Sequence, residues 1–265
     1  MFNLNAEIFE SPIPHLIVRD FVTDKKTLDY LRHNTESNEY LNRIDAGNLE
    51  RFEVVSGKHL RSGQLKYWKT SSYRHPVMPT DDFSIEFNSI IDEFLITLLE
   101  SHSVDKMVKS AFDPVLKQEF EKFDEDWNDP KFKNYSYGAY NACTSAKNII
   151  GWHLDNGDKY VVGFCYFKEE SDAATDGRLS LSNGETEKIF PIEDNVLILW
   201  PNLTNAWHKA GIRYPTNNLR RLVNLTWRSS SRKYHDYKAI RLNKVVDKNE
   251  LYDNKEFGFK KVNKI

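Results

Sequence analysis

The chain has 265 residues, of which 40% are hydrophobic and 29% are charged, and its formal net charge is −2. The apolar content is sufficient for a sizeable core, and the small net charge gives no indication of a nucleic-acid or membrane partner. No apolar run approaches the roughly 20 residues of a membrane span. Cys143 and Cys165 form neither a metal-type pair nor a disulfide framework, and the first residues lack the layout of a signal peptide. We therefore expect a cytoplasmic protein.

The chain begins with an apolar segment that is predicted to form a strand and then a helix. The extended run covers residues 14–22. Thr23 can cap the helix, and Asp24 suits the positive end of the helix dipole in its first turn. Two further short strands are predicted at residues 51–55 and 64–68.

The clearest helix is predicted from about residue 81 to residue 100, where apolar residues recur at helical spacing. Thr80 is its expected N-cap. A second helical stretch follows over residues 104–112, and Pro114 is predicted to interrupt it or to start a third helix. The apolar faces of these helices predict packing on a sheet.

From about residue 131 to residue 230 the sequence changes to short apolar runs separated by turn residues. Turn signals occur at residues 156–158, 176–177 and 183–184. Many short, evenly spaced strands are typical of a sandwich or jelly roll. The predicted fold class is therefore α+β and mainly β. We expect one domain over residues 1–265, in which about 1–130 supports a core at about 131–230 and a basic, aromatic extension follows at about 231–265.

Three side chains have the chemistry of a metal site. His153 and Asp155 are two residues apart, so on an extended segment both side chains point the same way. His208 lies far downstream and must come from another strand. Two imidazoles and one carboxylate are the usual protein ligands of a non-haem ferrous site that keeps positions open for oxygen chemistry. Because an isolated His-x-Asp arises easily by chance, its value depends on what surrounds it.

Arginine at the start of the last predicted core strand is an independent signal. The strand alternates, and Arg221 shares an apolar face with Val223, Leu225 and Trp227. An unpaired buried charge is costly, and a guanidinium matches a carboxylate in bidentate fashion. The partner of Arg221 is either an internal Asp or Glu, or the carboxylate of a ligand.

Taken together, residues from about 135 to 227 resemble the catalytic domain of the Fe(II)/2-oxoglutarate-dependent dioxygenases, in particular the prolyl 4-hydroxylase-like branch. The runs at residues 176–179 and 196–201 also resemble strands of that family. The resemblance implies a double-stranded β-helix (jelly-roll) core with N-terminal helices packed on its sheet. It also implies an iron triad of His153, Asp155 and His208.

The same resemblance implies a site for 2-oxoglutarate. Arg221 matches the basic residue that holds the far carboxylate of this cosubstrate. Because the stretch after the distal histidine is longer than is common in the family, Arg220 and Arg213 remain alternatives. Tyr166 is the expected tyrosine contact with the cosubstrate, and Tyr140 is a second candidate in the same pocket.

The implied activity is hydroxylation, or another oxidation, of an unactivated C–H bond in an amino-acid, peptidyl or small-metabolite substrate. Fe(II), 2-oxoglutarate and O2 would be required, with ascorbate as a candidate reductant, and 2-oxoglutarate would become succinate and carbon dioxide. Asp155 favours hydroxylation because halogenating members of the family lack this carboxylate. Two alternatives stay open: a metal enzyme on the same barrel that needs no 2-oxoglutarate, and a catalytically silent metal-binding jelly roll.

Overall fold

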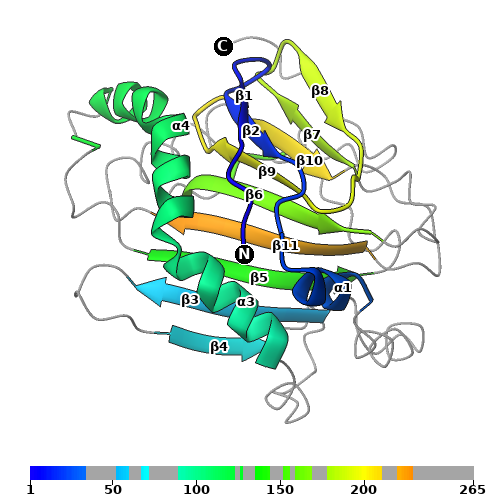
Figure 1. Ribbon diagram of the computed structural model, residues 1–265. Helices are drawn as coiled ribbons and strands as arrows, with labels where there is room; N and C mark the ends of the chain where they lie inside the picture. Colours follow the sequence, from blue (N-terminus) through cyan, green and yellow to red (C-terminus); the bar gives the residue numbers. More distant parts are fainter. Residues whose placement is uncertain are drawn as a thin grey trace, which may run out of the picture.

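The computed structural model describes residues 1–33, 52–59, 67–71, 89–122, 126–127, 135–143, 152–155, 159–168, 178–210 and 220–228. Two antiparallel sheets dominate this part of the chain (Figure 1). The large sheet contains, in spatial order, β1 (Glu7–Phe9), β2 (His15–Val18), β9 (Val196–Pro201), β6 (Lys159–Phe167), β11 (Arg220–Arg228), β5 (Tyr135–Cys143), β3 (Phe52–His59) and β4 (Tyr67–Ser71). The small sheet contains β10 (Trp207–Ala210), β7 (Leu179–Ser182) and β8 (Glu187–Phe190).

From β5 onward the chain passes repeatedly between the two sheets. After β6 in the large sheet it forms β7 and β8 in the small sheet, returns to the large sheet as β9, crosses back as β10, and returns once more as β11. This order places β11 between β5 and β6, and β6 between β11 and β9, all antiparallel. The prediction of a mainly β fold built from many short strands is confirmed, and the described strands pair antiparallel.

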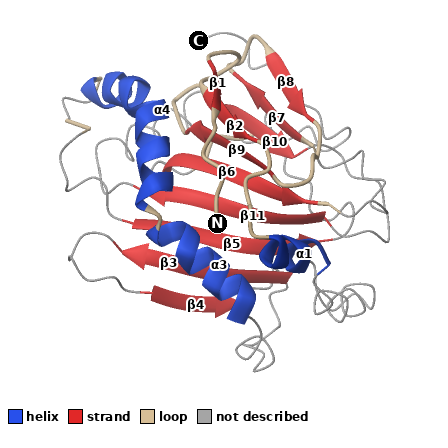
Figure 2. Ribbon diagram, in the orientation of Figure 1, coloured by secondary structure: helices blue, strands red, loops and turns tan. Residues whose placement is uncertain are grey.

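Three helices are described, and they lie on the large sheet (Figure 2). They are α1 (Lys25–His33), α3 (Ser89–Glu100) and α4 (His102–Glu121). Phe94 and Leu95 of α3 are buried, and Leu95 packs so closely on β5 that a Cβ at Gly138 would lie 2.9 Å from its Cδ2. The apolar helix faces therefore pack on a sheet as predicted. None of the helices in the described segments is long and apolar enough to cross a bilayer.

Helix ends differ from the sequence predictions in two places. The Asp24 carboxylate accepts a hydrogen bond from the Thr27 N–H at 2.8 Å, so Asp24, and not Thr23, caps α1. Pro114 lies inside α4 and does not interrupt it. Burial of Phe112 and Leu116 on either side of the proline offsets its missing hydrogen bond. Thr80 and residues 81–88 lie outside the described residues.

The strand predictions agree with the structure to within a few residues. Strand β3 contains most of the run predicted at 51–55, and β4 begins at Tyr67, late in the run predicted at 64–68. The turn predicted at residues 183–184 joins β7 to β8: Asn183 Oδ1 accepts from the N–H of Glu185 at 2.9 Å, and Gly184 has a φ of 94°. The turn signals at 156–158 and 176–177, and the extension at 231–265, lie outside the described residues.

Candidate metal centre

The backbone itself brings the two histidines together. The N–H of His153 donates to the carbonyl of His208 and the N–H of His208 donates to the carbonyl of His153, both at 3.0 Å. This reciprocal pair places the His-x-Asp segment beside the first half of β10. A pair of hydrogen bonds between residues 55 positions apart is a tertiary feature, and it fixes the spacing of the two imidazoles.

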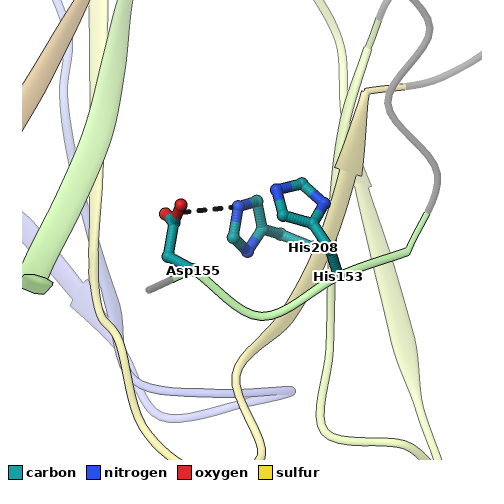
Figure 3. Close-up of side chains that lie close together, drawn as sticks. All are labelled: His153, Asp155 and His208. Atoms are coloured by element: carbon teal, nitrogen blue, oxygen red, sulfur yellow. Dashed lines mark ion pairs between the residues drawn. The ribbon is translucent and has the colours of Figure 1, made fainter. Parts of the chain in front are cut away.

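His153, Asp155 and His208 form a cluster whose ligand atoms all lie within 4.8 Å of one another. His208 Nε2 is 3.5 Å from Asp155 Oδ2, and the two imidazole centroids are 4.1 Å apart. Figure 3 shows the Asp155 carboxylate facing the His208 ring, with His153 beside it. Metal–ligand bonds near 2.1 Å require donor atoms about 3–4 Å apart, and the 3.5 Å between His208 Nε2 and Asp155 Oδ2 has this spacing.

The protonation states also suit a metal. Burial lowers the pKa of His208 to about 3, so near neutral pH the imidazole is uncharged and offers a lone pair. Burial by itself raises the pKa of Asp155, but its electrostatic interactions with the neighbouring His208, Lys159 and His153 side chains bring the pKa below its ordinary value, and Lys159 is the one of these that also donates a hydrogen bond to the carboxylate. The cluster therefore presents two imidazoles and an ionised carboxylate, which is the donor set predicted from the sequence.

Lys159 is a neighbour of this cluster that sequence reasoning missed. Its Nζ lies 2.6 Å from Asp155 Oδ1, and both side chains are about 15% exposed. Because Lys159 holds Oδ1, the other carboxylate oxygen is the one that faces His208. A charge-assisted hydrogen bond of this kind orients a ligand carboxylate. The available signal was weak: a lysine four residues after the aspartate, at the start of a strand.

The large sheet has two faces, and the cluster lies on one of them. The His208 ring is 5.1 Å from Trp200 of β9, and Trp200 is 5.5 Å from Phe164 of β6. We call this side the interior face. Residues directly opposite in antiparallel strands share a face. In β11 the interior face therefore includes Leu222, opposite Tyr166, and Asn224, opposite Phe164.

The other side of the large sheet is covered by helices, and we call it the helix face. Phe167 of β6 contacts Phe94 of α3, with ring centroids 6.4 Å apart. Trp227 of β11 donates from Nε1 to Asp105 of α4 at 3.1 Å. A cavity of about 370 Å3 also lies on this side, between α4, Tyr160 and Trp227, and none of the three clustered side chains lines it.

Arg221 lies on the helix face. It is opposite Phe167, the residue that contacts Phe94 of α3, and it alternates with Leu222 of the interior face. Its predicted burial is correct, since it is 5% exposed. The structure does not bring it to the three clustered side chains, however. Both faces of the large sheet are covered, so an apolar face does not identify the side of the site. This position gives no support to the predicted role of Arg221 in holding the far carboxylate of 2-oxoglutarate.

The remaining predicted residues are divided between described and undescribed parts. Tyr166 is 2% exposed and packs with Ile192 and Leu222 on the interior face. The backbone of Tyr140 lies in β5 opposite Val223, but its side chain lies outside the described residues, as do Arg213 and the side chain of Arg220.

Two buried polar atoms of the interior face have no hydrogen-bond partner within the described part of the chain. They are Trp200 Nε1 and Thr226 Oγ1. Trp200 is 0% exposed and Thr226 is 1% exposed, so bulk water does not satisfy either group. Buried polar groups are almost always hydrogen-bonded, and these two therefore indicate that a polar group belongs on this face.

No family model matches the sequence, and no curated protein gives a significant match. Several solved structures are similar to it. A prolyl-4-hydroxylase from Pseudomonas putida has 12% identity and a TM-score of 0.44, over 81% of this chain and 91% of that one. A prolyl 4-hydroxylase from Phytophthora capsici has 11% identity and a TM-score of 0.48, over 90% and 75%. An oxidoreductase of the 2OG-Fe(II) oxygenase family from Burkholderia pseudomallei has 14% identity and a TM-score of 0.37, over 78% and 92%.

Proposed function

We propose that this protein is an Fe(II)- and 2-oxoglutarate-dependent dioxygenase with a double-stranded β-helix core. The observation that carries the proposal is the cluster of His153, Asp155 and His208, whose ligand atoms lie within 4.8 Å of one another. Two imidazoles and one carboxylate on one side of an ion leave the remaining positions for cosubstrate and oxygen. Identities below 15% and TM-scores below 0.5 add no weight, so the proposal depends on these residues and their geometry.

The chain's own residues would prepare the site for the metal. His208 and His153 would bind as neutral imidazoles. Asp155 would bind through the oxygen that faces His208, since Lys159 holds the other one. The rings of Trp200 and Phe164 would exclude water from one side of the site. A dry, preorganised pocket strengthens charge interactions with bound ligands.

The interior face also suits a carboxylate-bearing cosubstrate. Trp200 Nε1 and Thr226 Oγ1 are buried donors that 2-oxoglutarate oxygens could satisfy. With iron, 2-oxoglutarate and O2 bound, the cofactors would supply oxidative decarboxylation to succinate and oxidation of a substrate C–H bond. The substrate would be an amino acid, a peptidyl residue or a small metabolite, and ascorbate would keep the iron reduced.

The test is succinate release by the purified chain with iron, ascorbate and 2-oxoglutarate. Succinate should form under air and not under anaerobic conditions, including slow release without the true substrate. His208→Ala should lose most bound iron and all turnover, because one ligand is removed. His102→Ala, which changes an exposed histidine of α4, is the matched control and should keep both. Full iron occupancy and normal activity in His208→Ala would overturn the proposal.

One observation favours a second candidate, a metal-dependent enzyme of this fold that does not use 2-oxoglutarate. Arg221, the basic residue expected to hold the cosubstrate, lies on the helix face. Calorimetric titration of the metal-loaded protein with 2-oxoglutarate separates the two candidates. Saturable binding supports the first, whereas metal binding without 2-oxoglutarate binding supports the second.

A further inference from the structure

We propose that the cavity on the helix face is a second binding site, which takes a small organic ammonium ion with an apolar body. The ligand would donate from its nitrogen to Asp113 and Tyr160, and its body would pack against Trp127 and Trp227. This inference goes beyond the proposed function and does not depend on it, because none of the three clustered side chains lines the cavity.

The first step is the size and the lining of the cavity. Its volume is about 370 Å3, which lies within the usual range for small-molecule sites. Three aromatic residues line it, Trp127, Tyr160 and Trp227, and each is at most 5% exposed. Val108 and Leu116 of α4 add an apolar surface. Aromatic rings carry negative charge on their faces, so walls of this kind favour cations over anions.

The second step is that the backbone turns Tyr160 toward this cavity. Phe164 lies on the interior face of β6, so strict alternation would place Tyr160 there as well. A register shift leaves Tyr160 without a partner in β11, and its ring instead lies on the helix face, 4.7 Å from the Trp127 ring. Asn202 holds this irregular backbone by donating from its N–H to the Tyr160 carbonyl at 2.8 Å. Such bulges commonly re-aim a side chain next to a functional site.

The third step is the hydroxyl group that this bulge brings to the cavity. Tyr160 is 5% exposed, and its hydroxyl makes no hydrogen bond within the segments that the structure describes. A buried polar group without a partner is costly, so a polar group in the cavity is expected to satisfy it. Burial, and then the charges of Asp105 and Asp113, raise the pKa of Tyr160. The hydroxyl therefore stays protonated and lies in a negative potential, which suits a cation.

The fourth step is the carboxylate of Asp113. Its Oδ1 accepts from Trp127 Nε1 at 2.7 Å, a neutral donor that does not compensate the negative charge, and Asp113 forms no ion pair among the described residues. The second carboxylate oxygen can accept from a ligand N–H. Lys106 and Lys109 also line the cavity, but both are exposed whereas Asp113 is half-buried. Exposed lysines extend their amines into water, so the less exposed part of the cavity is acidic and aromatic.

The experiment is calorimetric titration of the full chain with 2-phenylethylammonium, and with 2-phenylethanol and 3-phenylpropanoate as its neutral and anionic analogues. The protein is used both metal-free and loaded with Co(II), a redox-inactive substitute for iron. The ammonium ion should bind with the same Kd in both forms, since the cavity and the metal cluster lie on opposite faces of the large sheet. The two analogues should bind roughly tenfold more weakly or worse, because neither has a positive charge to pair with Asp113.

Two variants test the polar contacts. Asp113→Asn should raise the Kd of the ammonium ion by roughly tenfold or more and leave that of the alcohol nearly unchanged, since it removes the charge and keeps an acceptor for Trp127. Tyr160→Phe should raise the Kd about tenfold. Without ligand, Tyr160→Phe should not lower the thermal midpoint, because the hydroxyl that it removes has no partner in the described part of the chain. Glu121→Gln, which changes an exposed acid at the end of α4, is the control and should bind as the wild type does.

Equal affinity for the ammonium ion and the alcohol would show an apolar cavity without charge preference and would overturn the inference. Tighter binding of the carboxylate, or no saturable binding of the ammonium ion, would overturn it as well. Binding in the Co(II)-loaded form alone would place the nitrogen at the metal and not in the cavity. If Asp113→Asn does not fold, Tyr160→Phe decides, and wild-type affinity in that variant overturns the inference. None of these outcomes changes the iron and succinate measurements that test the proposed function, so the two can fail separately.

Discussion

At the scale of single residues, the Lys159–Asp155 pair determines how the carboxylate can meet a metal. A free carboxylate can present both oxygens to one ion, which would fill an extra coordination position. Lys159 engages Oδ1 at 2.6 Å and so leaves one oxygen for the ion. The lysine acts through Asp155 and is therefore a positioning residue.

We predict that Lys159→Met weakens Fe(II) or Co(II) binding by about 10- to 100-fold, the usual effect of removing a group that orients a metal ligand. Lys159→Arg should retain most of the affinity. The measurement is a metal titration followed by Co(II) absorption, whose band positions also report a change in coordination. Lys122→Met is the control, since Lys122 forms an ion pair of 2.7 Å with Glu119. Equal loss of metal affinity in both lysine variants would contradict the positioning role.

A second residue-scale feature is His15, which is completely buried in β2. Its Nδ1 lies 2.7 Å from the carbonyl of Ile13, and its Nε2 lies 3.0 Å from Lys188 Nζ. The Nδ1–H therefore donates to the carbonyl, and Nε2 accepts from the lysine. Burial lowers the pKa of His15 and Lys188 lowers it further, whereas the hydrogen bond to Ile13 opposes the shift.

This lowered pKa predicts how stability depends on pH. Below the ordinary value of 6.5 the unfolded chain binds a proton at this histidine that the folded protein does not bind. Stability from His15 is therefore fully present above pH 6.5 and declines as the pH falls toward the folded-state pKa. Urea unfolding at pH 7.5 and 5.5 measures the decline. His15→Gln, which does not titrate, should show a smaller decline, and an identical decline in both proteins would contradict the prediction.

At the scale of elements, the contact between β6 and β9 depends on a glycine. A Cβ at Gly163 would lie 2.2 Å from the Ile198 carbonyl oxygen and 2.9 Å from the Leu199 Cα. Backbone atoms cannot move aside without separating the strands. At Gly138 of β5 the nearest obstacle is the Leu95 Cδ2 at 2.9 Å, which is the end of a flexible side chain.

We therefore predict that Gly163→Ala lowers the free energy of unfolding by about 3 kcal/mol, at the upper end of the usual cost of overpacking. Gly138→Ala should cost only about 1 kcal/mol, because Leu95 can change rotamer. Urea denaturation of the two variants gives both values. Trp200 of β9 contacts the His208 ring, so a displaced β9 should also reduce metal binding in Gly163→Ala. Gly138→Ala should bind metal as the wild type does. A larger loss of stability in Gly138→Ala than in Gly163→Ala would contradict the prediction that a backbone clash costs more than a clash with a side chain.

At the scale of the whole molecule, one asparagine adds side-chain hydrogen bonds between Val22 and the large sheet, next to the pairing of β2 with β9. Asn195 Oδ1 accepts from the Val22 N–H at 2.8 Å, and its Nδ2 donates to the Val22 carbonyl at 3.0 Å. Asn195 has a φ of 55°, a left-handed conformation that asparagine tolerates better than most residues. It immediately precedes β9, so the same residue sets the start of that strand and holds the N-terminal segment.

Asn195→Ala should lower the free energy of unfolding by about 2–4 kcal/mol, because it leaves two backbone groups of Val22 without partners in a buried place. Asn183→Ala, in the exposed β7–β8 turn, should cost less, since water can replace its contacts. Chemical denaturation measures both, and limited proteolysis should show earlier cleavage near residue 22 in the first variant alone. Protection equal to that of the wild type would mean that Asn195 does not hold the segment.

The sequence by itself determined the local features of this protein. Short apolar runs bounded by turn residues predicted β6 and β9, alternation predicted β11, and apolar residues at helical spacing predicted α3 and α4, because these patterns depend only on local backbone geometry. The spacing of His153 and Asp155 predicted that one short segment supplies two ligands. His208 was added from its chemistry and its strand context, and the fold brings it beside the other two.

Only the tertiary structure decided which side of each strand meets the site. Arg221 and Arg228 lie on the same strand, and alternation along the sequence places them on opposite faces. Which of the two faces meets the metal cluster depends on what covers each side of the large sheet. Helices cover one side and the small sheet lies toward the other, so both sides are buried and hydrophobicity does not distinguish them. Lys159 was missed for the same reason. Its partnership with Asp155 depends on the path of the chain through space, which residue types and spacing along the sequence do not specify.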